Sequence, residues 1–122
     1  MKIAIALEEN KYESQVDKRF GRAAYFLIID IETKKYKIVE NEAKNEVSGA
    51  GLKVIRNLIA WKVDEIVAEE VGPKAVMLIK ELEIPIYKLG NINKVEEVLK
   101  AYNQKKLKKF DFSNKCQGLK MV

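Results

Sequence analysis

Residues 2–8 read Lys-Ile-Ala-Ile-Ala-Leu-Glu, and from Ile3 onward they are apolar until Glu8. A strand with one face in water alternates polar and apolar side chains, whereas a strand covered on both faces carries a nearly continuous apolar run. The stretch therefore predicts a strand at the centre of a sheet whose two faces are both covered. Sheets of that kind occur in α/β domains, with helices packed on each side.

Two further strands are expected after this one. Residues 24–30, Ala-Tyr-Phe-Leu-Ile-Ile-Asp, are rich in the aromatic and β-branched side chains that favour strands. A polar segment of hairpin length, 31–35, then leads into residues 36–40, which read as an antiparallel partner. The N-terminal third of the chain thus predicts a three-stranded meander.

Beyond residue 51 the apolar spacing changes from a repeat of two to the repeat of a helix. Helices are expected over 52–62, from Pro73 onward, and from an N-cap at Asn93 that pairs with Glu96. Short strands are expected between them, at 64–68 and 84–88. The side chains expected on the buried faces of these helices are Leu52, Ile55, Leu58, Ile59, Val76, Ile79, Leu82, Val95, Val98, Leu99 and Tyr102. The element order is therefore βββαβαβα.

Right-handed crossovers join parallel strands, so the third, fourth and fifth strands should run with the first, and the second against them. Their carboxyl ends then share one edge of the sheet. The loops 9–22, 41–51, 69–72 and 89–92 meet there. Ligands of open α/β sheets bind along this edge, where helix N-termini also favour anions.

The chain has 122 residues, enough for one domain, which we place at 1–103. Residues 104–122 form a basic tail in which six lysines outnumber a single acid, Asp111. The lysines are Lys105, Lys106, Lys108, Lys109, Lys115 and Lys120. Lysine runs at chain ends are more often solvated extensions, and the alternative is an interaction module that docks to an acidic partner or to nucleic acid. We do not expect nucleic acid to be the partner. With neither a cleavable leader nor a membrane-length apolar run, we expect a cytoplasmic protein and no membrane partner. The excess of Lys, Glu and Ile over Gln is typical of thermophiles.

Two arginines of the first loop, Arg19 and Arg22, flank Phe20 and Gly21. Arginine presents a planar fork of donors that suits carboxylate or phosphate, although ordinary loop salt bridges would use the same residues. Glycines at 49 and 51 precede a helix and could cradle an anion, or simply allow the chain to enter that helix. The third glycine of a dinucleotide-binding motif is missing, because Val54 stands in its place.

The chain has no histidine and one cysteine, Cys116. This composition excludes histidine-dependent nucleophilic catalysis and Cys/His zinc sites within one chain. Four carboxylates, Glu8, Glu9, Glu69 and Glu70, end two strands that should be neighbours. They suggest an alternative function, a Mg²⁺-dependent phosphoester or nucleic-acid hydrolase, whereas the simpler interpretation is that strand ends meet solvent.

Three motifs together resemble the dinitrogenase iron-molybdenum cofactor biosynthesis family, of the nitrogenase accessory protein X type. They are Val-Asp-Lys-Arg-Phe-Gly-Arg-Ala-Ala-Tyr-Phe at 16–26, Gly-Ala-Gly at 49–51 and Val-Gly-Pro-Lys-Ala at 71–75. The likeness extends over about residues 2–102 and leaves out the tail. It implies a ribonuclease-H-like three-layer α/β domain with a mixed five-stranded sheet. It also implies binding or carriage of the iron-molybdenum cofactor, or of its iron-sulfur precursor, during assembly.

The chain departs from the family at two places. Arg19 stands where histidine is common, and Glu69 and Glu70 stand where glycines are common. Iron-sulfur clusters usually take about four thiolates, which a single cysteine cannot supply. We therefore expect a non-enzymatic carrier with no catalytic residue and no metal ligand, which holds a pre-assembled anionic cluster and works with cluster-assembly proteins. The residues expected to hold it are Arg19, Phe20, Gly21, Arg22, Gly49, Gly51 and Gly72, with Cys116 as a further contact.

Overall fold

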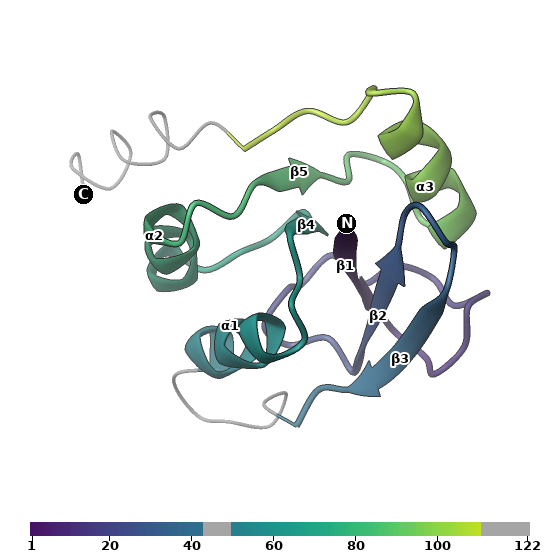
Figure 1. Ribbon diagram of the computed structural model, residues 1–122. Coiled ribbons are helices and arrows are strands. Elements are labelled where there is room, and N and C mark those ends of the chain that lie inside the picture. Colours follow the sequence, from purple (N-terminus) through teal and green to yellow (C-terminus); the bar gives the residue numbers. More distant parts are fainter. Residues whose placement is uncertain (43–49, 111–122) are drawn as a thin grey trace.

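The computed structural model describes residues 1–42 and 50–110. Its elements are β1 (Lys2–Leu7), β2 (Tyr25–Asp30), β3 (Tyr36–Glu40), α1 (Ala50–Ala60), β4 (Glu65–Ala68), α2 (Pro73–Glu81), β5 (Ile86–Lys88) and α3 (Val95–Asn103). This is the order βββαβαβα that the sequence predicts (Figure 1). Within the described residues, no helix has both the length and the apolar character needed to cross a membrane.

β1 lies at the centre of a five-stranded sheet of order β3-β2-β1-β4-β5. It pairs antiparallel with β2 and parallel with β4, while β2 pairs antiparallel with β3 and β4 parallel with β5. Only β2 therefore runs against the other strands, and the sheet is mixed. The predicted central position of β1 and the predicted strand directions are both confirmed.

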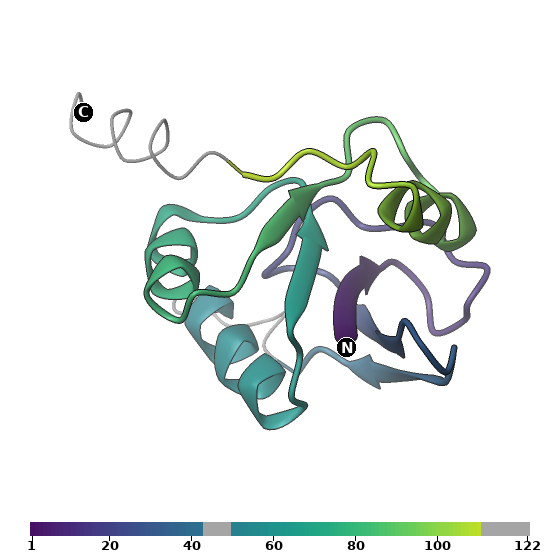
Figure 2. The same ribbon diagram turned by 45° about the horizontal axis from the view of Figure 1, so that its top comes forward.

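The side chains of β1 are buried on both faces of the sheet. Ala4 and Ala6 belong to the hydrophobic cluster that includes residues of α1 and α2. On the other face, Ile3, Ile5 and Leu7 pack with the buried residues of α3. Figures 1 and 2 show the resulting layers, with α1 and α2 on one side of the sheet and α3 on the other. The fold is a three-layer α/β domain, as expected.

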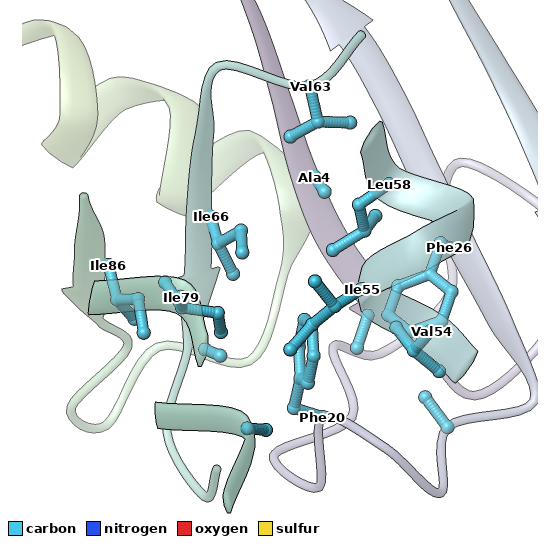
Figure 3. Close-up of a cluster of buried hydrophobic side chains, with 14 of the residues drawn as sticks. Ala4, Phe20, Phe26, Val54, Ile55, Leu58, Val63, Ile66, Ile79 and Ile86 are labelled. Carbon is cyan, nitrogen blue, oxygen red and sulfur yellow. The ribbon is translucent and has the colours of Figure 1, made fainter. Parts of the chain in front are cut away.

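The buried stripe of α1 differs from the predicted one. Leu52 and Ile59 are 39% and 49% exposed, whereas Val54, Ile55 and Leu58 are buried. Because successive residues turn by roughly 100° around a helix, Leu52 and Ile59 both lie on one flank of the stripe formed by the other three. Figure 3 shows Ile55 and Leu58 directed into the cluster, toward the small side chain of Ala4.

The end of α2 also differs from the prediction. Leu82 follows the helix as its C-cap and is 40% exposed. Glu83 then adopts a positive φ of 58°, and the Ile84 N–H donates to the carbonyl of Ile79. Ile84 is therefore used to close the helix, and β5 starts at Ile86 instead of residue 84.

The predicted N-cap of α3 is wrong. The helix begins at Val95, its N-cap is Lys94, and no side chain caps it. The carbonyl of Asn93 accepts a hydrogen bond from the Val16 N–H at 2.8 Å. Lys94 forms an isolated bridge with Gln15. Because residues 93 and 94 pair with the first loop, their backbone stays extended and the helix starts later.

The packed chain continues past residue 103, where the sequence predicts that the domain ends. The Lys88 N–H donates to the carbonyl of Lys108 at 2.7 Å, and the Phe110 N–H to that of Ile86 at 2.9 Å. Residues 108–110 therefore run antiparallel along the outer edge of β5 (Figure 1, yellow). The Phe110 side chain is 5% exposed and joins the cluster under α1 and α2. The rest of the predicted tail, 111–122, lies outside the described residues.

We predict that Phe110→Ala lowers the free energy of unfolding by about 3 kcal/mol, because it empties a packed aromatic site. Lys108→Ala is the matched control, since its side chain is exposed and its backbone pairing survives. Urea denaturation of both variants measures the difference. Equal, small effects would show that Phe110 is not part of the core.

Asn41, at the end of β3, ties the first loop to the rest of the sheet. It is 1% exposed, and its Nδ2 donates to the carbonyls of Ala23 at 2.8 Å and Gly21 at 3.2 Å. Its own N–H donates to the carbonyl of Ala24. Nothing in the sequence distinguishes it, because a lone Asn after a strand has the residue type of an ordinary turn.

We expect Asn41→Ala to cost about 1 to 3 kcal/mol of unfolding free energy, since it leaves buried carbonyls without their donor. Asn10→Ala, at an exposed position of the same first loop, should be close to neutral. Thermal and urea unfolding would test this pair. Comparable stability of the two variants would contradict the role given to Asn41.

Candidate functional site

The loop between β1 and β2 lies across the carboxyl ends of the central strands. Val16 bridges Leu7 at the end of β1, and the Asp17 N–H donates to the carbonyl of Ala6 at 2.9 Å. On one side Gln15 bridges Lys94, and on the other Arg19 bridges Glu70. Residues 15–19 thus connect the loop before α3 with the loop before α2.

Two backbone hydrogen bonds join this loop to the end of β4. The Phe20 N–H donates to the carbonyl of Glu70 at 2.9 Å, and the Glu70 N–H donates to the carbonyl of Lys18 at 2.7 Å. Gly72, the N-cap of α2, follows Glu70 by two residues. The arginine-bearing loop and the Gly-Pro turn therefore lie at the same edge of the sheet.

Phe20 anchors the loop beneath the two helices on that side. It is 1% exposed and belongs to a cluster that contains Val54 and Ile55 of α1 and Ala75 of α2. The centre of its ring lies 5.6 Å from the centre of the Phe26 ring, and the two ring planes form an angle of 60°. Figure 3 shows the Phe20 ring beside Ile55. Through this ring the loop packs against the middle of α1 and the first turn of α2, while the backbone bond to Glu70 brings residue 20 close to the N-cap of α2.

The two arginines of the loop are both exposed. The Arg19 side chain is 63% exposed, and its Nε and Nη2 donate to the two carboxylate oxygens of Asp17 at 3.3 and 3.2 Å. This hydrogen bond, with the negative charges of Asp17, Glu70 and Glu8, raises the pKa of the Arg19 guanidinium above its ordinary value. Arg19 therefore stays charged in a setting that also holds several carboxylates.

Of the four glycines of the predicted site, Gly21 lies in the arginine loop, where its carbonyl accepts the Asn41 Nδ2–H. The other three are placed differently. Gly49 lies outside the described residues, and Gly51 lies in the first turn of α1. Gly72 has φ −62° and ψ 154°, with no side-chain hydrogen bond to cap α2. A Cβ built on Gly72 meets nothing within 4 Å. The structure thus brings Arg19, Phe20 and Gly72 to one edge, with the start of α1 on the same side.

The four glutamates at this edge do not form a cation site. Across residues 1–42 and 50–110, no three Asp, Glu, Cys or His side chains group as metal ligands would. Glu9 instead pairs with Lys11 at 3.1 Å, and Glu69 accepts the Gly90 N–H at 3.1 Å. Within the described ranges, the positions of these glutamates thus give no support to the hypothesis of a Mg²⁺-dependent hydrolase.

The basic tail is described only as far as Phe110, so Cys116 lies outside the described residues. Lys109 places its Nζ 5.7 Å from the centre of the Tyr87 ring. In β5, the Nζ of Lys88 lies 5.6 Å from the centre of the Phe110 ring. These lysines thus contact aromatic rings at the outer edge of β5, where cation-π attraction holds them.

Comparisons of the sequence with known proteins find a matching family model and a similar protein. The family model described as dinitrogenase iron-molybdenum cofactor matches residues 1–105. The uncharacterized protein MJ0580 of Methanocaldococcus jannaschii is 33% identical over 114 residues, which cover 91% of this chain and 92% of that protein.

Two solved structures are similar over most of their length. The apo form of the orange protein from Desulfovibrio gigas has a TM-score of 0.80 and 26% identity, covering 87% of this chain and 89% of that one. The NifB-like protein TM1290 from Thermotoga has a TM-score of 0.76 and 30% identity, covering 88% of this chain and 90% of that one. With a family model that spans 105 of its 122 residues, the chain belongs to the dinitrogenase iron-molybdenum cofactor family.

Proposed function

We propose that this protein is a non-enzymatic carrier of an anionic iron-sulfur or iron-molybdenum cluster, or of a precursor of such a cofactor. Family membership supports a cofactor-related role. The observation that carries the proposal is the pairing of residues 18–20 with Glu70, because it joins the arginine loop to the start of α2. The cluster is cargo in this proposal, delivered to cluster-assembly partners in the cytoplasm.

Directed N–H groups would supply most of the binding. Arg19 and Arg22 offer charged donors, and the first turns of α1 and α2 offer N–H groups that have no acceptor within their own helix. Hydrogen bonds to charged groups contribute about 1.5 to 3 kcal/mol each. Three or four of them would reach about 8 kcal/mol, which corresponds to micromolar affinity. No bond between protein and metal is needed at that strength.

The open space at Gly72 supports a ligand that lies against the backbone. Its φ of −62° is accessible to every residue, and a Cβ would meet nothing within 4 Å. Neither conformation nor packing in the described structure therefore requires glycine here. A bulky anion in contact with the first N–H groups of α2 would require it, because a side chain would fill the space above them.

The cysteine content favours a cluster that is assembled before it is bound. Cys116 is the single thiol of the chain, and there is no histidine. A cluster built on this protein would need about four thiolates. A pre-formed anion needs only donors, and Cys116 could add one contact to it.

Carboxylates beside the arginines suit reversible binding. Glu8, Glu70 and Asp17 all act on the charge of Arg19. Their presence lowers the positive potential at this edge and so limits affinity for anions that approach it. A carrier has to release its cargo, and moderate affinity serves that purpose.

We predict that the purified protein retains colour after anaerobic incubation with ferrous iron, sulfide and tetrathiomolybdate, followed by gel filtration. Arg22→Ala should lower the retained visible absorbance by about tenfold, because one charged hydrogen bond is lost. Arg56→Ala is the matched control, since it removes an exposed arginine from the middle of α1. Colourless wild-type protein would refute the carrier function, and equal losses in both variants would refute the site.

Gly72→Ala should separate ligand binding from folding. We predict unchanged or slightly raised stability, by up to about 1 kcal/mol, because alanine restricts the unfolded chain. Cluster uptake should nevertheless fall. Gly90→Ala should instead lose roughly 1 to 2 kcal/mol, since Gly90 has a φ of +63°. Denaturant unfolding and the same uptake assay check both variants, and normal uptake by Gly72→Ala would contradict close contact at this turn.

A further inference from the structure

Asp17 is the buried acid of this edge, with 5% of its surface exposed. Its carboxylate accepts three hydrogen bonds from one residue, from the backbone N–H of Arg19 at 2.9 Å, from Nε at 3.3 Å and from Nη2 at 3.2 Å. Its own N–H donates to the carbonyl of Ala6 at the end of β1. Asp17 is thereby fixed to the central strand, and Arg19 is fixed to Asp17.

This pairing uses a defined side of the guanidinium. Arginine carries five N–H donors in one plane. Asp17 takes the side formed by Nε and Nη2, so the side formed by Nη1 and Nη2 remains for another acceptor. The Arg19 side chain is 63% exposed although its partner is 6% exposed. One side of the fork is thus held by the fold while the other is accessible from water.

We propose that Asp17 is a positioning residue of the anion site, an inference that rests on the proposed carrier function. It holds Arg19 so that two parallel N–H groups are presented together. The matching ligand is an anion with two acceptor atoms side by side, such as the sulfido edge of a metal-sulfur cluster or of a tetrahedral thiometalate. Because the side chain is ordered before binding, less rotamer entropy is lost when the ligand arrives.

Two other roles for Asp17 would make different predictions for anion affinity. If its charge only competed with the ligand for Arg19, removing that charge would strengthen anion binding. If it served the fold alone, its removal would change stability and leave affinity per folded molecule unchanged. Asp17→Asn distinguishes these roles, because asparagine keeps an oxygen for the Arg19 backbone N–H but loses the second acceptor of the fork.

The test is a tetrathiomolybdate titration, followed by visible absorbance, of wild type, Asp17→Asn, Arg19→Lys and the double variant. Each single variant should bind about tenfold more weakly, and the double variant should be no weaker than Arg19→Lys, because both changes disable the same fork. Arg19→Lys keeps a positive charge opposite the buried Asp17 and so guards against misfolding. The control is Asp64→Asn, because Asp64 lies at the opposite edge of the sheet, where its carboxylate accepts the Lys2 N–H. This variant should bind tetrathiomolybdate with unchanged affinity.

The Nε–Hε signal of Arg19 in ¹⁵N relaxation experiments provides a readout without ligand. Positioning predicts an ordered signal in the wild type and a mobile one in Asp17→Asn. Tighter or unchanged binding by Asp17→Asn, or an Arg19 side chain equally mobile in both proteins, would overturn the proposal. If the wild type fails to bind tetrathiomolybdate, the carrier function itself fails and this inference falls with it, whereas normal wild-type binding confines any failure to Asp17.

Discussion

The backbone pairing between residues 18–20 and Glu70 is the contact on which the candidate site depends. It brings a loop that follows β1 to a turn that follows β4, about 50 residues later in the chain. Where the loop crosses the buried strand ends, its polar groups need partners, and the carbonyls of Ala6 and Glu70 provide them. Burial of the Phe20 side chain adds roughly 1.5 to 3 kcal/mol to this attachment. Arg19 and Arg22 are thus carried on a loop that is part of the packed domain.

The charges at this edge are mixed, and that mixture is informative about function. A site built for tight anion binding would gather cations and exclude acids. Here Asp17 pairs with Arg19, and Glu8 and Glu70 act on the same guanidinium. Under the proposed carrier function, affinity would come from the direction of the N–H groups more than from net charge. Directed but moderate binding is the behaviour expected of a protein that passes its cargo to a partner.

Much of the fold follows from patterns in the sequence. The apolar run of β1 predicts its central position, and the handedness of crossovers predicts which strand ends meet. The errors have local causes that depend on tertiary contacts. Asn93 has the residue type of an N-cap, but its carbonyl pairs with Val16, and Leu82 continues a helical repeat beyond the point where α2 closes. Phe110 follows several lysines in the sequence, and nothing in that local pattern indicates that the chain pairs with β5 there and buries the Phe110 side chain.

The candidate site is predictable in its outline but not in its detailed connections. The motif around Arg19 and Arg22 stands out in the sequence, as does the turn at Gly72. The roles of Asp17 and Asn41 depend on burial and on hydrogen-bond partners, which a single sequence does not reveal. The acidic residues show the reverse case, since their spacing along the chain suggests a cation site that the geometry of the described residues does not form.

The most direct test of this site is a ¹H–¹⁵N correlation spectrum recorded while tetrathiomolybdate, a diamagnetic anion, is titrated into the labelled protein. If the anion binds where the arginine loop meets the start of α2, the largest shift changes will fall on the amides of residues 19–22 and 74–76. Changes concentrated instead on the turn between β2 and β3, at the opposite edge of the sheet, would show that the ligand site lies elsewhere.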